Sequence, residues 1–401
     1  MCNISIRNID NYRLESVKNA VSKCFSDIYG TSEGNPLKNI VLPGEKVFIK
    51  PNWVASRWRD SCPHKDDLYC VITHPAVIEA VADFAALALE GKGKITIGDN
   101  PSIDADFEEL MHHTGIRRLL NKYDVPCEIV DLRPLVCEDL KYYGHKYQMA
   151  HRVGDKNGNV EVNLGSDSLL FGLDPKNFRG VFDEREDTIK AHTGYSQLYT
   201  YSRSLYDADV YISIPKLKTH QKVGATLNLK GLVGSITDKN QLVHWQVGYP
   251  EIGGDEYPDK ESYDESKSAK VTHRGAWPGN DTIWRMVVDL YKGMLLKQRK
   301  YISVVDGIVG GEGQGPFCPT SKFSNSIIAG GDLLNTDIVS ARYMGLNPQK
   351  IKYLAYFLEN NYTSYKDIHV ILEGVIQEDF FESNSKYKDF YVVDQWHEIK
   401  V

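Results

Sequence analysis

Four apolar segments of this sequence each lead into side chains that could bind an anion or a metal ion. The four sets are Lys50 and Asn52 at the end of VFIKPN, Asp99 and Asn100 after ITIG, Lys216, Lys218 and His220 after VYISIP, and Asp306 after YISVV, with Glu312 in the glycine-rich stretch behind it. Lysines suit an anionic ligand and carboxylates suit a divalent cation such as Mg²⁺ or Mn²⁺, because opposite charges offset each other's loss of water. The pattern predicts a site for a phosphorylated or carboxylated small molecule, with a divalent metal as its candidate cofactor.

The basic segment KLKTHQKVGATLNLKGLVG carries most of this prediction. Strand alternation would place Lys216, Lys218 and His220 on one side, and the glycines and amides that follow can approach an anion closely. Lys222 could extend the basic lining. The candidate anion-binding residues are Lys50, Asn52, Asn100, Lys216, Lys218, Asn228, Lys230 and Gly313. A plain basic surface loop is the alternative interpretation.

Three carboxylates and one histidine are the candidates for chemistry at this site. Asp99, Asp306 and Glu312 are the candidate metal ligands. Asp306 and Glu312 could instead act as acid and base, and His220 is the candidate for proton transfer. The reaction could be group transfer, ligation or isomerisation.

The elements that must position these residues are strands alternating with helices. Residues 4–9 form a strand pattern, apolar residues then recur at helical spacing over 14–28, and two strand–helix–strand units end before residue 135. Thr73 and Pro75 predict the start of a helix, with Thr73 as its N-cap. The sequence therefore predicts an α/β fold with a mainly parallel, Rossmann-like sheet and helices on both faces. Ligands of such sheets bind outside the carboxyl ends of the strands, where all four sets would meet.

We expect a single domain over residues 1–401 with two insertions, at about 134–201 and 237–281. The first is rich in Gly, Asp and Asn with short apolar runs, which favours some β structure. The second contains the acidic run GGDEYPDKESYDESKSAK and is too long for an ordinary loop, so it is a lid, an excursion or disorder. His244, His273 and Arg274 flank that run and could close over a ligand if it is a lid.

The glycine-rich stretch GIVGGEGQGP resembles a dinucleotide loop only superficially. Its third glycine, Gly315, is followed by Pro316 rather than by the start of an apolar helix. We expect a tight loop whose backbone amides approach a ligand. No GxxxxGK[ST] motif is present, and nothing in the sequence indicates NAD or flavin binding.

The seven cysteines are scattered and odd in number, which predicts thiols rather than disulfides. Cys62, His64, Cys70 and His74 have the spacing C-x-H-x5-C-x3-H, which contains side chains that zinc accepts. A redox or metal-handling protein using Cys62, Cys70 and these histidines is the rival hypothesis. A ligand-binding protein without turnover is the third.

The composition excludes several broad classes of protein. A formal net charge of -7 gives no basic field for nucleic acid, and no apolar run reaches the length of a membrane span. The N-terminal residues MCNISIRNID do not resemble an export signal, so we expect a cytoplasmic protein. The oligomeric state stays open.

Six motifs of this chain resemble the family catalogued as domain of unknown function 362. They are IKPNWV, THPAVIEAV, GDNPS, ISIPKLKTHQKVGATLNLKGLVG, DGIVGGEGQGP and AGGDLLNTDIVSARYMGLNP, spread over residues 47–348. The resemblance implies a bacterial or archaeal α/β protein, and some members carry a ferredoxin-like cluster domain or an export signal. This chain lacks a run such as C-x2-C-x2-C-x3-C, so an iron–sulfur cluster is not expected.

Overall fold

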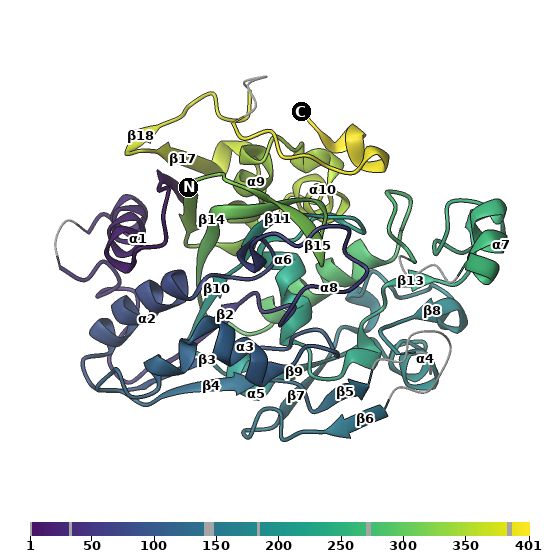
Figure 1. Cartoon of the computed structure of the whole chain (residues 1–401), viewed down its shortest axis with the longest axis horizontal. Coiled ribbons are helices and arrows are strands. Elements are labelled where there is room, and N and C mark those ends of the chain that lie inside the picture. The colour runs from purple at the N-terminus through teal and green to yellow at the C-terminus, as the bar shows by residue number, and fades with distance from the viewer. Residues whose placement is uncertain (1, 32–33, 140–147, 183–184, 270–273, 383–386) are drawn as a thin grey trace.

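The core of the computed structural model is a twisted mixed sheet (Figure 1). The structure describes residues 2–31, 34–139, 148–182, 185–269, 274–382 and 387–401. Within them the main strand order is β18 (Val375–Ile376), β17 (Ile368–Leu372), β1 (Cys2–Asn8), β16 (Ser326–Gly330), β14 (Lys300–Gln314), β10 (Val210–Ile214), β2 (Lys46–Pro51), β3 (Lys94–Asp99), β4 (Cys127–Asp131). Three shorter strands join this path, namely β11 (Lys216–His220), β12 (Gly224–Ala225) and β15 (Cys318–Lys322).

The half of the sheet that matters for the site is parallel. Strand β10 pairs in parallel with both β14 and β2, and β2, β3 and β4 continue in the same direction. Strand β16 is antiparallel to both β1 and β14, and β11 runs parallel to β14. The predicted mainly parallel α/β sheet is confirmed, with β2, β3 and β10 ending at one common edge.

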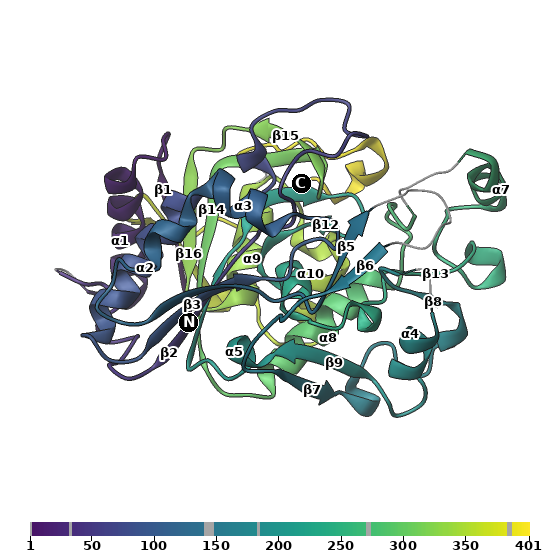
Figure 2. The same cartoon turned by 60° about the horizontal axis from the view of Figure 1, so that its bottom comes forward.

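Helices cover both faces of the sheet because alternate strand residues are apolar on both sides. In β2, Val47 and Ile49 belong to one buried cluster and Phe48 to the other. Helices α1 (Leu14–Tyr29) and α2 (Pro75–Leu89) pack on the first face, and α9 (Leu333–Tyr343) packs on the second. Figure 2 shows these two layers on either side of the strands.

Seven further helices lie in the described part of the chain, and the longest of them contributes buried residues to the same apolar cluster as α9. They are α3 (Phe107–Thr114), α4 (Glu186–Ala191), α5 (Arg203–Tyr206), α6 (Leu227–Gly231), α7 (Lys260–Ala269), α8 (Ile283–Leu295) and α10 (Lys352–Glu359). Helix α2 begins where predicted, but its N-cap is His74, whose Nδ1 accepts a hydrogen bond from the Ala76 N–H. Thr73 instead donates its hydroxyl to the Ile214 carbonyl, which ties the helix start to the end of β10.

The two insertions meet each other. The first contains β structure, with the pairs β5 (Leu135–Asp139) and β6 (Gln148–His151), and β7 (Asn159–Asn163) and β9 (Leu198–Ser202). Its strand β8 (Phe178–Arg179) pairs with β13 (Trp245–Gln246) of the second insertion. In the second insertion, Lys239 reaches the end of β3 through its hydrogen bond to the Pro101 carbonyl, whereas α7 projects away from the sheet (Figure 1). His273 lies outside the described residues.

The expectation that every cysteine is a thiol is wrong for two of them. Cys62 and Cys318 form a disulfide with a Cα–Cα distance of 5.2 Å, although 256 residues separate them. The loop after β2 and the hairpin of β14 and β15 bring them together, which sequence spacing alone cannot reveal. In the described part of the chain, no helix is long and apolar enough to cross a membrane.

Candidate functional site

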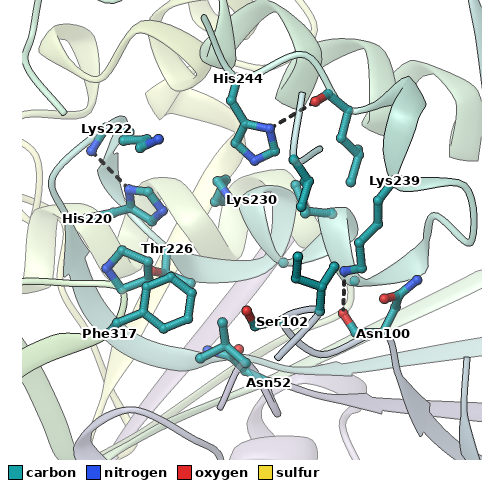
Figure 3. Close-up of a pocket in the computed structure, with 18 of the residues that line it drawn as sticks. Asn52, Asn100, Ser102, His220, Lys222, Thr226, Lys230, Lys239, His244 and Phe317 are labelled. Atoms are coloured by element: carbon teal, nitrogen blue, oxygen red, sulfur yellow. Dashed lines mark hydrogen bonds between the residues drawn. The ribbon is translucent and has the colours of Figure 1, made fainter. Parts of the chain in front are cut away.

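A cavity of about 310 Å³ opens at the carboxyl edge of β2 and β3 (Figure 3). Its walls come from the ends of these strands, from β11 and α6, and from both insertions. Its polar and charged lining residues are Lys50, Asn52, Arg59, Asp99, Asn100, Ser102, Asp104, Lys218, His220, Gln221, Lys222, Thr226, Lys230, Lys239 and His244. Apolar side chains, among them Ile103, Leu242 and Phe317, fill the gaps between them. The cavity lies where the fold predicts a ligand.

The two acidic side chains of the lining are already paired. Lys50 and Asp99 form a buried ion pair at 2.7 Å, and Arg59 contacts Asp104 at 3.4 Å. Four lysines remain, here called the lysine cluster, and they are Lys218, Lys222, Lys230 and Lys239. None of the four lies within ion-pair distance of a carboxylate among the described residues. The cavity therefore holds a clear excess of positive charge.

Backbone carbonyl groups and an aromatic ring, rather than carboxylates, contact three lysines of the cluster. Lys218 donates to the backbone carbonyl of Val71 at 2.8 Å, and Lys239 donates to that of Pro101 at 2.8 Å. The Lys222 ammonium lies 4.3 Å from the centre of the Trp245 ring. These contacts orient the ammonium groups but leave their charges uncompensated.

Burial, and with it at least one nearby cation, lowers the pKa of every lysine in the cluster. The pKa falls to about 7 for Lys218, Lys222 and Lys239 and to about 8 for Lys230, from an ordinary value of 10.5. Loss of hydration is the largest cause in each case, and nearby cations lower the value further. The negative charge of an anion in the cavity would raise these pKa values again, so anion binding near pH 8 should be accompanied by proton uptake.

We expect the empty protein to become more stable as the pH rises from about 7 to about 9. Folded lysines with a pKa of 7 to 8 bind fewer protons in this window than unfolded lysines do, so the free energy of unfolding rises with pH. The free-energy cost of burying the charges is complete only where all four lysines are protonated, well below pH 7, and it falls as the cluster loses protons. Thermal unfolding at several pH values measures this, and Lys230→Gln should show a smaller rise than the wild type. Equal rises would contradict the prediction.

The two histidines that line the cavity are different tautomers. The Lys222 backbone N–H donates to His220 Nδ1 at 3.0 Å, so that nitrogen carries a lone pair and the proton lies on Nε2. His244 Nδ1 lies 2.9 Å from the Leu242 carbonyl, which only accepts, so Nδ1 carries the proton and Nε2 a lone pair. Burial, then the neighbouring lysines, hold the pKa of both rings well below 6.5. Both rings are therefore neutral at pH 7.

Four buried polar atoms of the lining have no hydrogen-bond partner within the described structure. They are Asn52 Nδ2, Asn100 Oδ1, Thr226 Oγ1 and Trp245 Nε1. Buried polar groups are normally hydrogen-bonded, and leaving one unpaired costs about 1–3 kcal/mol. Several such atoms around one cavity indicate that a polar ligand or water completes their bonding.

The structure brings seven of the predicted site residues to this cavity. They are Lys50, Asn52, Asp99, Asn100, Lys218, His220 and Lys230. They share one edge because β2, β3 and β10 are parallel neighbours, as the sequence predicted. Lys50 and Asp99 are engaged with each other, however, which leaves neither fully available to a ligand.

Lys216 and Asp306 do not line the cavity, which corrects their predicted roles. Their side chains are fully buried and form an ion pair at 2.5 Å. Asp306 also accepts hydrogen bonds from the Tyr12 hydroxyl at 2.8 Å and the His74 N–H at 2.9 Å. The pair joins β11 to β14 inside the fold, so we assign it to stability rather than to ligand binding.

The other predicted residues also serve the fold. The glycine-rich stretch is not a loop, because β14 continues to Gln314 and pairs with β15. Glu312 therefore contacts Lys322 and the Tyr391 N–H, and the Gly313 N–H donates to the Tyr391 carbonyl. Asn228 is buried, and its side chain binds Asp337 and Ser303. None of these three residues reaches the cavity.

The predicted metal sites do not form among the described residues. No group of three or more His, Cys, Asp or Glu side chains there is arranged to hold a metal ion. Asp99, Asp306 and Glu312 have separate partners, so they are not a common ligand set. Cys62 is in the disulfide, His74 caps α2, and the Cys70 Sγ lies 3.7 Å from the Pro319 carbonyl, so the proposed zinc set is also dispersed.

Sequence reasoning missed two important members of the site. Lys239 and His244 both come from the second insertion, where only a lid hypothesis hinted at His244. Lys239 belongs to no recognisable sequence motif and follows the residues ITD, which indicate nothing beyond a turn. The pairing of β8 with β13, between residues 178–179 and 245–246, is what brings this segment to the cavity.

The sequence profile described as a domain of unknown function (DUF362) matches residues 47–153 and 136–342. The chain belongs to the DUF362 family. The predicted family membership is thus confirmed, and both insertions and the cavity lie within the matched region. A thylakoid-associated protein of Synechocystis sp. is 23% identical to this DUF362 protein over 317 residues, which is 79% of this chain and 68% of the relative.

Two solved structures resemble the DUF362 protein at low identity. The lactate racemase apoprotein of Thermoanaerobacterium thermosaccharolyticum has 11% identity and a TM-score of 0.38 over 85% of this chain. The DUF362 chain spans only 56% of that protein. A protein of Thermotoga maritima has 10% identity and a TM-score of 0.39, covering 97% of this chain and 93% of its own. Neither likeness assigns a reaction to this chain.

Proposed function

We propose that this DUF362 protein is an enzyme whose cavity binds a small molecule with at least two negative charges. The observation that carries the proposal is the lysine cluster, four ammonium groups in one cavity with no carboxylate partner in the described chain. Unpaired buried charges are costly, so a fold that keeps four of them together is best explained by a ligand that neutralises them.

The shape and lining support a small ligand with an apolar body. A volume of about 310 Å³ is at the lower end of ordinary ligand pockets. Phosphate and carboxylate groups can both accept hydrogen bonds from lysines and from the unpaired Asn52 amide, and Phe317 offers an apolar contact. A phosphate ester or a dicarboxylate of a few carbons matches these features.

Lys230 offers the cleanest test because its side chain has no hydrogen-bond partner among the described residues that its removal would orphan. Lys230→Gln should weaken binding of dihydroxyacetone phosphate or 2-oxoglutarate about 10- to 100-fold, because a charge-assisted hydrogen bond is lost. The same change should raise the free energy of unfolding of the empty protein by about 1–3 kcal/mol, since a desolvated charge is removed. Calorimetric titration and chemical denaturation measure the two effects.

The exposed Lys92 provides a matched control, and Lys92→Gln should change neither quantity. The titrations are run with and without Mg²⁺ or Mn²⁺, because a metal that enters with the ligand remains part of the proposal. Equal binding by wild type and Lys230→Gln, or no binding of either dianion, would contradict an anion site here. Binding without any turnover would favour a ligand-binding protein instead.

A further inference from the structure

His220 and His244 present different chemistry to the same cavity. Figure 3 shows both rings at the cavity with the Lys230 side chain between them in that view. The fixed hydrogen bonds at the two Nδ1 atoms leave an N–H at His220 Nε2 and a lone pair at His244 Nε2. Neither Nε2 atom has a hydrogen-bond partner in the described part of the chain. The cavity thus holds one hydrogen-bond donor and one proton acceptor on separate rings.

We propose that His244 is the catalytic base of a proton-transfer reaction and that His220 stabilises the oxygen on which negative charge develops. This inference rests on the proposed anion site and names its reaction as removal of a proton from a carbon next to a carbonyl group. Of group transfer, ligation and isomerisation, it selects isomerisation.

The step balances without an added oxidant or reductant. His244 Nε2 takes the proton, and the electron pair of the broken C–H bond becomes the C=C bond of an enolate. The carbonyl π pair moves to the oxygen, which accepts a hydrogen bond from His220 Nε2–H. His244 then returns the proton to the same carbon, which completes an exchange. In an α-hydroxy ketone, the hydroxyl proton of that carbon instead moves to the enolate oxygen. His244 then gives its proton to the former carbonyl carbon while C=O forms at the hydroxyl-bearing carbon, which completes an isomerisation.

The environment of the two rings fits these roles. A neutral imidazole is a weak acid, so His220 acts as a hydrogen-bond donor to the enolate oxygen rather than as a source of a full proton. The lysine cluster places positive charge beside the developing enolate. The negative charges of a bound dianion would offset that cluster and make His244 more basic than it is in the empty cavity.

The test measures hydrogen exchange in two probes that carry two negative charges and a ketone. Dihydroxyacetone phosphate and 2-oxoglutarate are incubated with the protein in D₂O, and proton NMR follows loss of the hydrogens next to the ketone. We expect the wild type to accelerate exchange of at least one probe over buffer. His244→Gln should lose about 10²- to 10⁴-fold of this acceleration while still binding the probe, because only the proton acceptor is removed. His220→Gln should lose a smaller part, and the exposed His112→Gln should match the wild type.

The outcomes separate this inference from the anion site on which it rests. Binding that depends on Lys230 without accelerated exchange would overturn the proton-transfer role and leave the anion site standing, whereas absence of binding would overturn both. Exchange that survives in His244→Gln would assign the base to another group, such as a lysine of the cluster. A second test needs no substrate, because ¹⁵N-histidine NMR distinguishes the two tautomers. A proton found on His244 Nε2 at pH 7 would also overturn the assignment.

Discussion

Asp306→Asn should lower the free energy of unfolding by about 3–5 kcal/mol, because it leaves the buried Lys216 ammonium without its counter-charge. Both side chains are fully buried and lie 2.5 Å apart. Asparagine keeps the shape of the side chain and one oxygen that can accept from Tyr12. The substitution leaves no cavity, so the loss reports the missing charge together with the two hydrogen bonds that Oδ2 accepts from Lys216 and the His74 N–H. Chemical denaturation measures it.

A double variant distinguishes an ion pair from two independent contributions. Lys216→Met with Asp306→Asn removes both charges, so it should be less destabilised than Asp306→Asn alone. The folded fraction of each variant should still bind the dianion probes, because neither residue lines the cavity. Additive losses in the double variant would contradict coupling within the ion pair. Loss of binding without loss of stability would return Lys216 and Asp306 to the ligand site.

Gly234→Ala should be about as damaging, since Gly234 lies against the other buried ion pair. A Cβ at this position would overlap Asp99 Oδ1 and lie 2.8 Å from Lys50 Nζ. The pair is itself buried and cannot move away without losing its contact at 2.7 Å. We expect a loss of about 3–5 kcal/mol in the free energy of unfolding, together with weaker anion binding, because the pair forms part of the cavity wall.

Gly231 is the matched control for this substitution. It lies three residues earlier, has a helical φ of -60°, and a Cβ there would meet no atom within 4 Å. Gly231→Ala should leave stability unchanged or raise it by about 0.4–1 kcal/mol by restricting the unfolded chain. Equal effects at both glycines would show that the overlap with the Lys50–Asp99 pair is not the cause.

The pattern of apolar residues along the sequence was sufficient to predict the strands that position the site. In β2 and β10, consecutive residues such as Val47 and Phe48 are apolar, so both faces of these strands are apolar, which indicates buried parallel strands and hence a common carboxyl edge. The side chains just beyond those strands, such as Asn52, Asn100 and Lys218, were predicted to meet there, and the structure places them around one cavity. The strand pattern depends on neighbouring residues, so the sequence alone could identify it.

The sequence could not show which side chains from distant segments form ion pairs or disulfides with each other. Lys216 and Lys218 are two residues apart in the same strand, and the sequence offered one role for both. Only the tertiary structure places Asp306 of β14 against Lys216 and leaves Lys218 facing the cavity. The disulfide between Cys62 and Cys318 could not be predicted for the same reason, because it joins the loop after β2 to strand β15, which is distant in the chain.

The sequence by itself determined the α/β class, the family, the edge of the sheet where polar groups collect and the cationic character of the site. The tertiary structure decided which charges are free, because that depends on which side chain lies opposite each one at a few ångströms. It also brought Lys239 and His244 to the cavity through the pairing of β8 with β13. Charge type is a property of the residue, whereas availability to a ligand is a property of its packed surroundings.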